Sequence, residues 1–347
     1  MTCITTNLRS MHTAFVDGAA HDVLPLYDVL TPTGTCPMNP LVGGTVALRF
    51  AHAIHCIAAG KPITKTFGEG LSSAAWRTSP AAVERIVRPE LSRIHEGIAL
   101  RDAAWEDAHH HQPHAVYLST TSAVKVGVTR TATVPSRWID QGATAAILLA
   151  ETPYRQLAGL MEVALKGLCA DRTAWRAMVQ NRSAGDDLRT RKEAALALLP
   201  AVSTPFFCTD DTVTRMAYPV LQYPDRVTAL NLDATPAFTG TLTGIKGQYL
   251  LFADGHVLNV RAHAGYRVHL AFEGRSKHEV ARMLADVGTM STHHARNCSQ
   301  VVARHDWRKR WATRDRFRAH SVENGAFSSG ASQPLWINCN PLQMLIH

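Results

Sequence analysis

Three polar residues near the middle of the chain are of the types that phosphodiester cleavage requires. That reaction needs a group that deprotonates water or relays its proton, a cation that meets the phosphate charge, and a carboxylate that holds a divalent metal. Tyr117, Arg137 and Glu162 are one candidate for each task. They lie far apart in the sequence, so this chemistry depends on elements that bring them together.

The segment over 114–168 predicts such elements. An apolar run that ends in Tyr117 is followed by a Ser/Thr turn and a β-branched run that contains Gly127, a pattern that predicts an antiparallel hairpin. A helix that begins after Pro135, the buried strand "AAILLAE" and the helix "PYRQLAGLMEVALKGL" follow. The expected order is strand (114–119), strand (123–129), helix (136–142), strand (145–151) and helix (153–168).

Each candidate also has a purely structural interpretation. Tyr117 is typical of a strand aromatic that packs in a core. Arg137 is spaced to pair with Asp140 at i, i+3, and otherwise offers a phosphate a planar fork of donors. Gln141 follows Arg137 by one helical turn on the same face, and Glu162 is a carboxylate on a largely apolar helix flanked by small residues. The residues alone leave both interpretations open.

The rest of the chain predicts an α+β protein of several parts. Short β-branched runs punctuated by Pro and Gly indicate a β-rich N-terminal module, and a spacing near 3.6 predicts a helix over 79–108. Alternating strands and the hairpin signal "DG" at 254–255 indicate a C-terminal β module. The expected parts are a disordered segment (1–20), the N-terminal module (21–111), a small α/β domain (112–203), the C-terminal β module (204–273) and a basic, mostly disordered tail (274–347).

Composition limits the class of protein. The chain has 347 residues, a formal net charge of +8 and no run of eighteen apolar residues, so a membrane span is not expected. No secretory signal is apparent, and the seven cysteines are scattered without a CxxC pair, which suits a reducing cytoplasm. From Gly274 onward there are 11 Lys and Arg against 5 Asp and Glu. This tail either attracts nucleic acid by counterion release or is a solvated appendage.

Several motifs resemble those of known families. "AVY" (115–117) and "KVG" (125–127) resemble the two name-giving tripeptides of the GIY-YIG nucleases, and Arg137 and Glu162 stand where that family has its helix arginine and its metal-binding glutamate. More closely, "HAVYLSTTSAVKVGVTR", "PSRWIDQGA", "AGLMEVALKG", "DRTAWR" and "GTLTGIKGQYLLF" resemble the bacterial DUF2797 family over about 40–272. The nuclease resemblance implies a Mg²⁺-dependent phosphodiesterase acting on DNA or RNA. It implies that the catalytic residues are Tyr117, Lys125, Arg137, Gln141 and Glu162, with Glu162 as the metal ligand.

Lys125 is a departure from the nuclease pattern that bears on activity. It stands where the nucleases carry a tyrosine. A lysine can steer a phosphate, but it takes over the proton relay of a phenol only if its pKa falls sharply. The residue therefore weakens the expectation of cleavage more than the expectation of phosphate binding.

A second departure lies before the hairpin. Relatives in DUF2797 carry cysteine pairs that resemble a zinc-binding module, whereas this chain keeps Cys56 and has other residues where the remaining ligands are expected, namely Ala59, Ser72, Ala75 and Ser92. A structural zinc needs four ligands, so none is expected. The histidines at 109–111 and 114 are expected to be exposed to solvent rather than to replace the cysteines.

Four further residues are candidates for contact with nucleic acid: Arg130, Trp138, Lys246 and Arg261. Lys246 and Arg261, together with His263, would line a groove for a backbone phosphate; the alternative is a plain β module with surface cations. A nuclease, a nuclease-like protein that binds nucleic acid without cutting it, and a structural adaptor all agree with the sequence. The choice between DNA and RNA and the oligomeric state stay open.

Removal of residues 274–347 is expected to weaken nucleic-acid binding about equally for all sequences and to flatten its salt dependence. The reason is that the tail carries 11 of the 36 Lys and Arg in the chain. The measurement is the slope of log K against log salt for the full-length and the truncated chain. An unchanged slope would show that the tail takes no part in binding.

Overall fold

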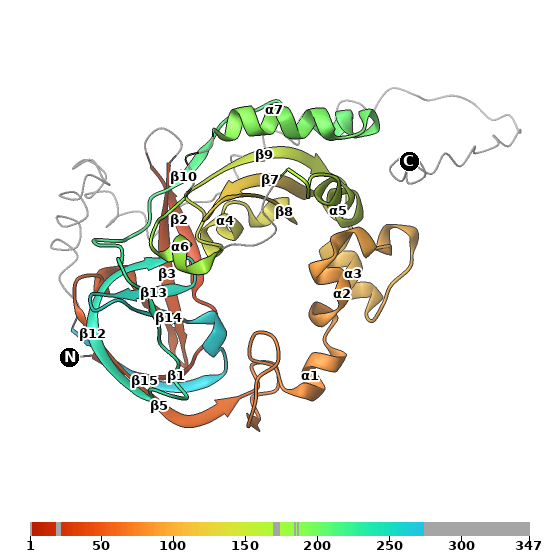
Figure 1. Ribbon diagram of the computed structural model, residues 1–347. Coiled ribbons are helices and arrows are strands. Elements are labelled where there is room, and N and C mark those ends of the chain that lie inside the picture. The colour runs from red at the N-terminus through yellow and green to blue at the C-terminus, as the bar shows by residue number, and fades with distance from the viewer. Residues whose placement is uncertain (1, 19–21, 169–173, 184, 186, 274–347) are drawn as a thin grey trace, which may run out of the picture. The chain divides into compact units, whose positions relative to one another are not determined.

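The computed structural model describes residues 2–18, 22–168, 174–183, 185 and 187–273 of the chain (Figure 1). Within these residues the protein contains both helices and strands, and the strands form two sheets, so the expected α+β class is confirmed. None of the described helices is long and apolar enough to cross a membrane. The predicted tail over 274–347 lies outside the described residues.

The first sheet combines strands from both ends of the described chain. The N-terminal strand pairs antiparallel with the last strand, so that Cys3 lies opposite Ala271. Two separate β modules were expected here, and that expectation is wrong, because N-terminal and C-terminal strands alternate within one sheet. Its order is β1 (Thr2–Asn7), β15 (Tyr266–Glu273), β5 (Thr45–His55), β12 (Ala237–Lys246), β13 (Tyr249–Phe252), β14 (His256–Asn259) and β11 (Thr228–Ala229), and β6 (Pro62–Ile63) pairs with β5.

The second sheet contains the hairpin that the sequence predicts. Its first strand pairs antiparallel with the second, and Tyr117 lies directly opposite Gly127. The sheet also contains strands from outside the expected α/β domain (112–203), namely those within residues 12–37 and 214–216. Its order is β2 (His12–Asp17), β3 (Asp22–Thr31), β10 (Thr214–Met216), β9 (Ala145–Thr152), β7 (His114–Thr120) and β8 (Val124–Arg130), and β4 (Gly34–Pro37) pairs with β3.

Two expectations for the first third of the chain are wrong. Residues 1–20 were expected to be disordered, yet β1 and β2 fall within them. Each is ordered by backbone hydrogen bonds to a partner strand, β15 for β1 and β3 for β2. The expected helix over 79–108 is broken into short pieces, because Pro80 and Pro89 each begin a new turn. The pieces are η3 (Pro80–Ala82), α2 (Glu84–Val87), η4 (Pro89–Leu91), η5 (Ile94–Glu96) and α3 (Ala103–His110), and a further short helix, α1 (Ser73–Thr78), precedes them.

Four helices cover the two faces of the second sheet (Figure 1). Two of them, with Leu157 and Leu188, pack on the face that carries Val116 and Leu118. The other two pack on the opposite face, in the larger core that the two sheets share. The first pair is α5 (Arg155–Ala164) and α7 (Leu188–Leu198); the second is α4 (Ser136–Asp140) and α6 (Trp175–Val179). The remaining 3₁₀ turns are η2 (Asn39–Leu41), η6 (Thr131–Thr133), η7 (Ala201–Phe206) and η8 (Arg261–His263).

Gly127 is required by the ring of Tyr117, which lies across it. A Cβ atom at position 127 would be 2.6 Å from Cζ of Tyr117, closer than packed carbon atoms approach. The ring is also fully buried, so it has no free space into which to move. The "KVG" motif therefore ends in glycine because the tyrosine of the "AVY" motif occupies the space above it.

Gly127→Ala is expected to lower the free energy of unfolding by roughly 1–3 kcal/mol, the usual cost of overpacking a filled core. The measurement is denaturant unfolding of the parent and the variant. Gly167→Ala is the matched control, since a Cβ atom there meets nothing within 4 Å. A Gly127→Ala variant as stable as this control would contradict the packing argument.

Candidate functional site

Tyr117 points between the sheets and toward α4. Its side chain is 0% exposed, its ring meets Trp138 edge-on at a centroid distance of 5.7 Å, and its hydroxyl donates to Oε1 of Gln141 at 3.3 Å. Burial raises the pKa of Tyr117 to about 12, although the charge of Arg137 acts in the opposite direction. The phenol is therefore protonated at neutral pH and serves as a hydrogen-bond donor.

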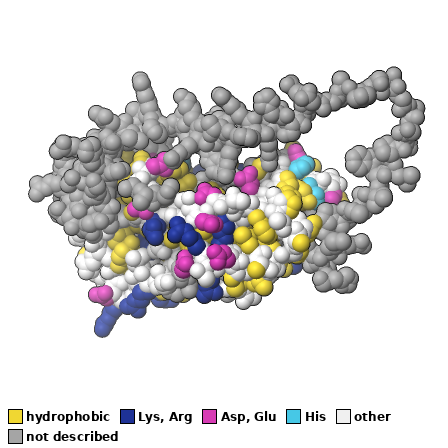
Figure 2. Space-filling model, turned by 90° about the horizontal axis from the view of Figure 1, so that it is seen from above, with side chains coloured by type: hydrophobic (Ala, Val, Ile, Leu, Met, Phe, Trp, Pro, Cys, Tyr) yellow, Lys and Arg dark blue, Asp and Glu magenta, His cyan; other side chains and the backbone are white. Residues whose placement is uncertain are grey.

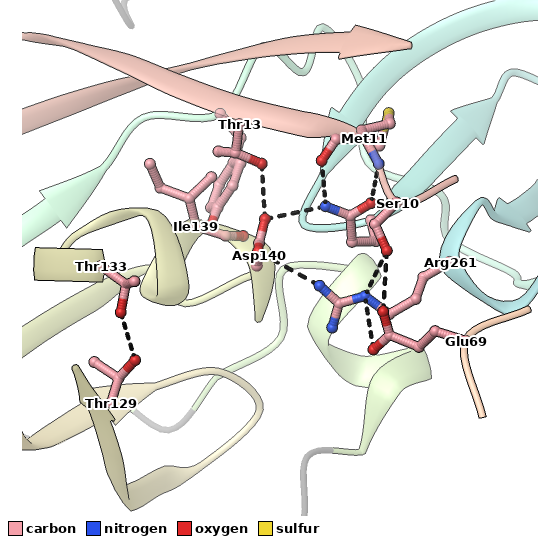
Figure 3. A network of polar contacts seen from close by, with 11 residues as sticks. Ser10, Met11, Thr13, Glu69, Thr129, Thr133, Ile139, Asp140 and Arg261 are labelled. Atoms are coloured by element: carbon pink, nitrogen blue, oxygen red, sulfur yellow. Dashed lines mark hydrogen bonds and ion pairs between the residues drawn. The ribbon is translucent and has the colours of Figure 1, made fainter. Parts of the chain in front are cut away.

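Arg137 is exposed on α4, beside the hydroxyl end of Tyr117. The pairing of Arg137 with Asp140 that its spacing suggested is not among the ion pairs of the described residues, because the carboxylate of Asp140 points elsewhere. It accepts hydrogen bonds from Oγ1 of Thr13 at 2.7 Å and from Nε2 of Gln248 at 3.0 Å, and it pairs with Nη2 of Arg261 at 3.4 Å (Figure 3). This arrangement leaves the guanidinium of Arg137 directed at the Tyr117 end of the site.

Lys125 lies on β8, the strand that pairs with the strand of Tyr117. Its side chain is half-buried, and burial lowers its pKa to about 8, with a further lowering by the charge of Arg137 and an opposing effect of Glu162. A lysine with this pKa is partly neutral near pH 8. The fall in pKa that a proton-accepting lysine requires is thus present at this position.

Glu162 lies on α5, half-buried, where its charge acts on both Tyr117 and Lys125. Burial raises its pKa, while Arg155 and Lys166 lower it. The five residues expected to be catalytic therefore interact within one region. They come from β7, β8, α4 with the residue that follows it, and α5.

Two residues of this region were not identified from the sequence. A Cβ atom at Gly159 would be 2.2 Å from the backbone nitrogen of Glu90, so α5 and η4 touch backbone to backbone. This contact brings the charge of Glu90 next to Glu162 and Arg155. Burial lowers the pKa of Arg155 to about 10, and its Nη2 donates to the backbone oxygen of Ile86 at 2.8 Å. The small residues around Glu162 signalled a close approach, but not which segment approaches.

Two of the four residues expected to contact nucleic acid are buried, and a third is paired with carboxylates. Trp138 is 3% exposed in the core, and Lys246 is 0% exposed. Arg261 is held by Asp140 and by Glu69, whose Oε1 lies 3.6 Å from its Nε (Figure 3). Arg130 differs, because it is half-buried at the end of β8 and its charge acts on Arg155. The expected phosphate groove of the C-terminal module is therefore wrong, because its lysine is buried and its arginine is paired.

Cys56 is buried, and its sulfur accepts hydrogen bonds from nearby backbone groups. Burial alone would raise the pKa of Cys56, but backbone N–H groups of Ser72 and Ala59 bind the sulfur and lower the pKa to about 7. The N–H of Ser72 lies 3.2 Å from Sγ. Two of the positions at which the missing ligands were expected thus do surround the sulfur. Among the described residues, no group of three or more His, Cys, Asp and Glu could hold a metal ion.

The expectation that the histidines are exposed to solvent is only partly right. His111 is exposed, but His110 and His114 are 2% and 0% exposed. Nδ1 of His110 lies 3.1 Å from Oγ of Ser92, and burial lowers the pKa values of both buried histidines to about 4. His110 on α3 and His114 on β7 are therefore neutral buried residues, because burial disfavours the charged form.

Comparison with known families shows the family to which the chain belongs. Residues 43–268 match the family described as "Protein of unknown function (DUF2797)", and this match covers more than half of the sequence, so the chain belongs to the DUF2797 family. No curated protein matches the sequence. No solved structure matches it either.

The buried amino group of Lys246 makes the stability of the protein depend on pH. Its Nζ donates to Oδ1 of Asn181 at 2.7 Å and lies 5.4 and 5.3 Å from the ring centroids of Tyr218 and Tyr223. Burial lowers its pKa to about 7. The unfolded chain, with an ordinary lysine pKa of about 10.4, binds the proton more tightly, so this residue makes stability rise as the pH rises from about 7 toward 10.

Lys246→Met is therefore expected to raise the free energy of unfolding below pH 7, by up to a few kcal/mol, and to make its rise between pH 7 and 10 shallower than in the parent. The measurement is denaturant unfolding of both proteins across this pH range. Lys166→Met, at an exposed position two residues after the end of α5, is the control for a change of net charge. Equal pH dependence in the Lys246→Met variant and the parent would contradict the lowered pKa.

Proposed function

We propose that the protein is a Mg²⁺-dependent phosphodiesterase that acts on nucleic acid, with a GIY-YIG-like core made of β7, β8, α4, β9 and α5. The observation that carries this proposal is the meeting of Tyr117, Lys125, Arg137, Gln141 and Glu162 in one region, as shown by their contacts and mutual electrostatic effects. The cross-strand pair of Tyr117 and Gly127 also supports it. A tyrosine that only packs in the core has no need of an exposed arginine beside its hydroxyl group, whereas a catalytic tyrosine beside a phosphate does.

The charges of the site suit a phosphate. Three cations, Lys125, Arg137 and Arg155, lie with the carboxylates of Glu90 and Glu162, and Arg137 is the exposed member. An exposed planar guanidinium is suited to binding a phosphate through two parallel hydrogen bonds. The face seen from the α7 side instead mixes Lys and Arg with Asp and Glu in its visible described part (Figure 2). We therefore assign phosphate binding to the α4 side.

Glu162 would hold the metal ion. Mg²⁺ is commonly bound through one or two carboxylates, with waters and substrate phosphates completing its shell, so the small carboxylate set at α5 and η4 fits this ion. When bound, Mg²⁺ would neutralise charge that develops on the phosphate. Burial raises the pKa of Glu162, and a bound cation would lower it again by stabilising the charged carboxylate.

The pKa values divide the remaining roles between Lys125 and Tyr117. Lys125, with a pKa of about 8, would accept the proton of the attacking water. Tyr117, with a pKa of about 12 and a hydrogen bond to Gln141, would stay protonated and orient that water. The lysine that departs from the nuclease pattern would thus take over the proton transfer.

The second candidate function is nucleic-acid binding without cleavage. The favouring observation is that Glu162 lies beside Arg155, whose charge already lowers the pKa of that carboxyl group. A carboxylate neutralised by arginine would have less affinity for a metal ion. Arg137 would serve as a phosphate contact under either function.

Cleavage is expected to depend on Glu162 and Lys125, and binding on Arg137. The assay is a Mg²⁺ titration on labelled single- and double-stranded DNA and RNA, read for cut product and for bound fraction. Glu162→Gln is expected to lower the cleavage rate about 10²–10³-fold with binding nearly unchanged, because it removes a group that acts mainly in the transition state. Arg137→Ala is expected to weaken both readouts.

Variants of Lys125 separate proton transfer from phosphate binding. Lys125→Arg keeps the positive charge but cannot be deprotonated, so cleavage is expected to fall while binding is retained. Arg226→Ala, which removes another exposed arginine, is the control. Cleavage that survives Glu162→Gln would refute the assigned site, whereas binding without cleavage that is lost in Arg137→Ala would establish the second candidate function.

A further inference from the structure

A pocket of about 360 Å³ lies between α6, the β13–β14 hairpin and the segment that contains Asp233. Its volume falls within the range of small-ligand sites. None of its lining residues belongs to the site around Arg137 and Glu162. The residues that matter here are Trp175, Asp233, Tyr249, Asn259, His263 and Tyr266.

The pocket has flat aromatic walls. The rings of Trp175 and Tyr249 stack on each other, parallel within 4° and with centroids 5.8 Å apart, and both residues are only partly buried. The rings of His263 and Tyr266 meet edge-on at 5.2 Å. Partly exposed parallel rings are suited to stacking against a planar heterocycle.

Internal hydrogen bonds hold the polar groups of the pocket. The hydroxyl of Tyr266 donates to Oδ2 of Asp233 at 2.8 Å, and the N–H of Asp233 donates to Oδ1 of Asn231 at 2.9 Å. Oδ1 of Asn259 accepts the N–H of Ala262 at 3.1 Å. These bonds fix the side chains before a ligand arrives, which reduces the entropy cost of binding.

His263 is neutral, and both of its ring nitrogens are already bonded within the protein. Its Nε2 accepts the N–H of Leu232 at 3.3 Å, so its Nδ1 carries the proton and donates to the backbone oxygen of Asn259 at 2.8 Å. Asp233 then carries the only full charge among the described lining residues. Its Oδ1 takes part in none of the hydrogen bonds found for the described part of the chain. A ligand must therefore present donors.

We propose that this pocket binds an unpaired guanine base, an inference that rests on the proposed binding of nucleic acid. A carboxylate presents two acceptors side by side, and guanine presents two adjacent donors, N1–H and the N2 amino group, on the edge that unpaired bases offer to proteins. Adenine, cytosine and uracil each place an acceptor beside their donor on that edge, which would face a carboxylate oxygen. The aromatic walls would stack on the guanine ring.

A guanidinium side chain of a protein partner has the same donor pair, but the surroundings disfavour it. The guanidinium carbon of Arg176 lies 4.6 Å from the centroid of the Trp175 ring, beside the pocket. This cation would repel a second guanidinium and attract the phosphate attached to a base. The net charge of +8 acts in the same direction.

The test measures binding of the full-length protein to single-stranded oligonucleotides of thymidine that contain one central guanine, hypoxanthine or adenine. The measurements are made in EDTA, so that no metal-dependent cleavage interferes. The guanine strand is expected to bind about ten-fold more tightly than the adenine strand, because a good bidentate pair discriminates by that order. Hypoxanthine, which lacks the amino group, is expected to lie between them. Free GMP and AMP show whether the base alone suffices or the strand is needed.

The variants distinguish the pocket from the phosphate site. Asp233→Asn replaces one acceptor by a donor and is expected to abolish the preference for guanine, and Trp175→Ala is expected to weaken binding of all strands about ten-fold. Thermal unfolding confirms that each variant folds. Arg137→Ala is the control, since it is expected to weaken guanine and adenine strands equally and to keep their ratio.

Three outcomes would overturn the proposal. They are equal binding of guanine and adenine strands by the parent, a guanine preference that persists in Asp233→Asn, and displacement of the guanine strand by an arginine-containing peptide that needs Asp233. Absence of Mg²⁺-dependent cleavage by the parent, with the guanine preference intact, would refute the phosphodiesterase and leave this pocket standing.

Discussion

The carboxylate of Asp140 is the contact on which the candidate site depends. It ends α4, a helix of five residues that is too short to hold its own position. From there it binds Thr13 of β2, Gln248 of the β12–β13 turn and Arg261 of η8 (Figure 3). Gln248 in turn binds both backbone groups of Met11, at 2.7 and 3.1 Å. Segments from both sheets thus fix the helix that carries Arg137.

This dependence explains why the chain between residues 112 and 203 is not an independent domain. The helix that presents Arg137 is held by residues from the N-terminal strands and from the last hairpin of the first sheet. The face of the second sheet that carries Tyr117 is covered by the core that both sheets share. A fragment limited to the hairpin, α4, β9 and α5 would contain the site residues but not the contacts that orient α4.

The features that could be predicted are those that a local pattern determines. Alternation and turn residues predicted the β7–β8 hairpin and the "DG" turn at 254–255, and an apolar stripe predicted α5. Features that depend on distant partners could not be found this way. The strands within residues 1–20 need β15 and β3 as partners, Lys246 is buried by the Tyr218 and Tyr223 rings, and Glu90 reaches the site through a contact at Gly159.

The two proposed contact points are joined by backbone packing. A Cβ atom at Gly142, just after α4, would lie 2.3 Å from the sulfur of Met178 on α6, the helix that begins with Trp175. Gly247, in the turn before Tyr249, also lies close to the backbone oxygen of Asp140, since a Cβ atom there would be 3.1 Å away. With no side chain at either glycine, α4 packs closely against α6 and the β12–β13 turn, and these two segments lead directly into Trp175 and Tyr249 of the pocket. A strand held by its phosphate at Arg137 and by a base at Trp175 would therefore contact segments that are packed directly against one another.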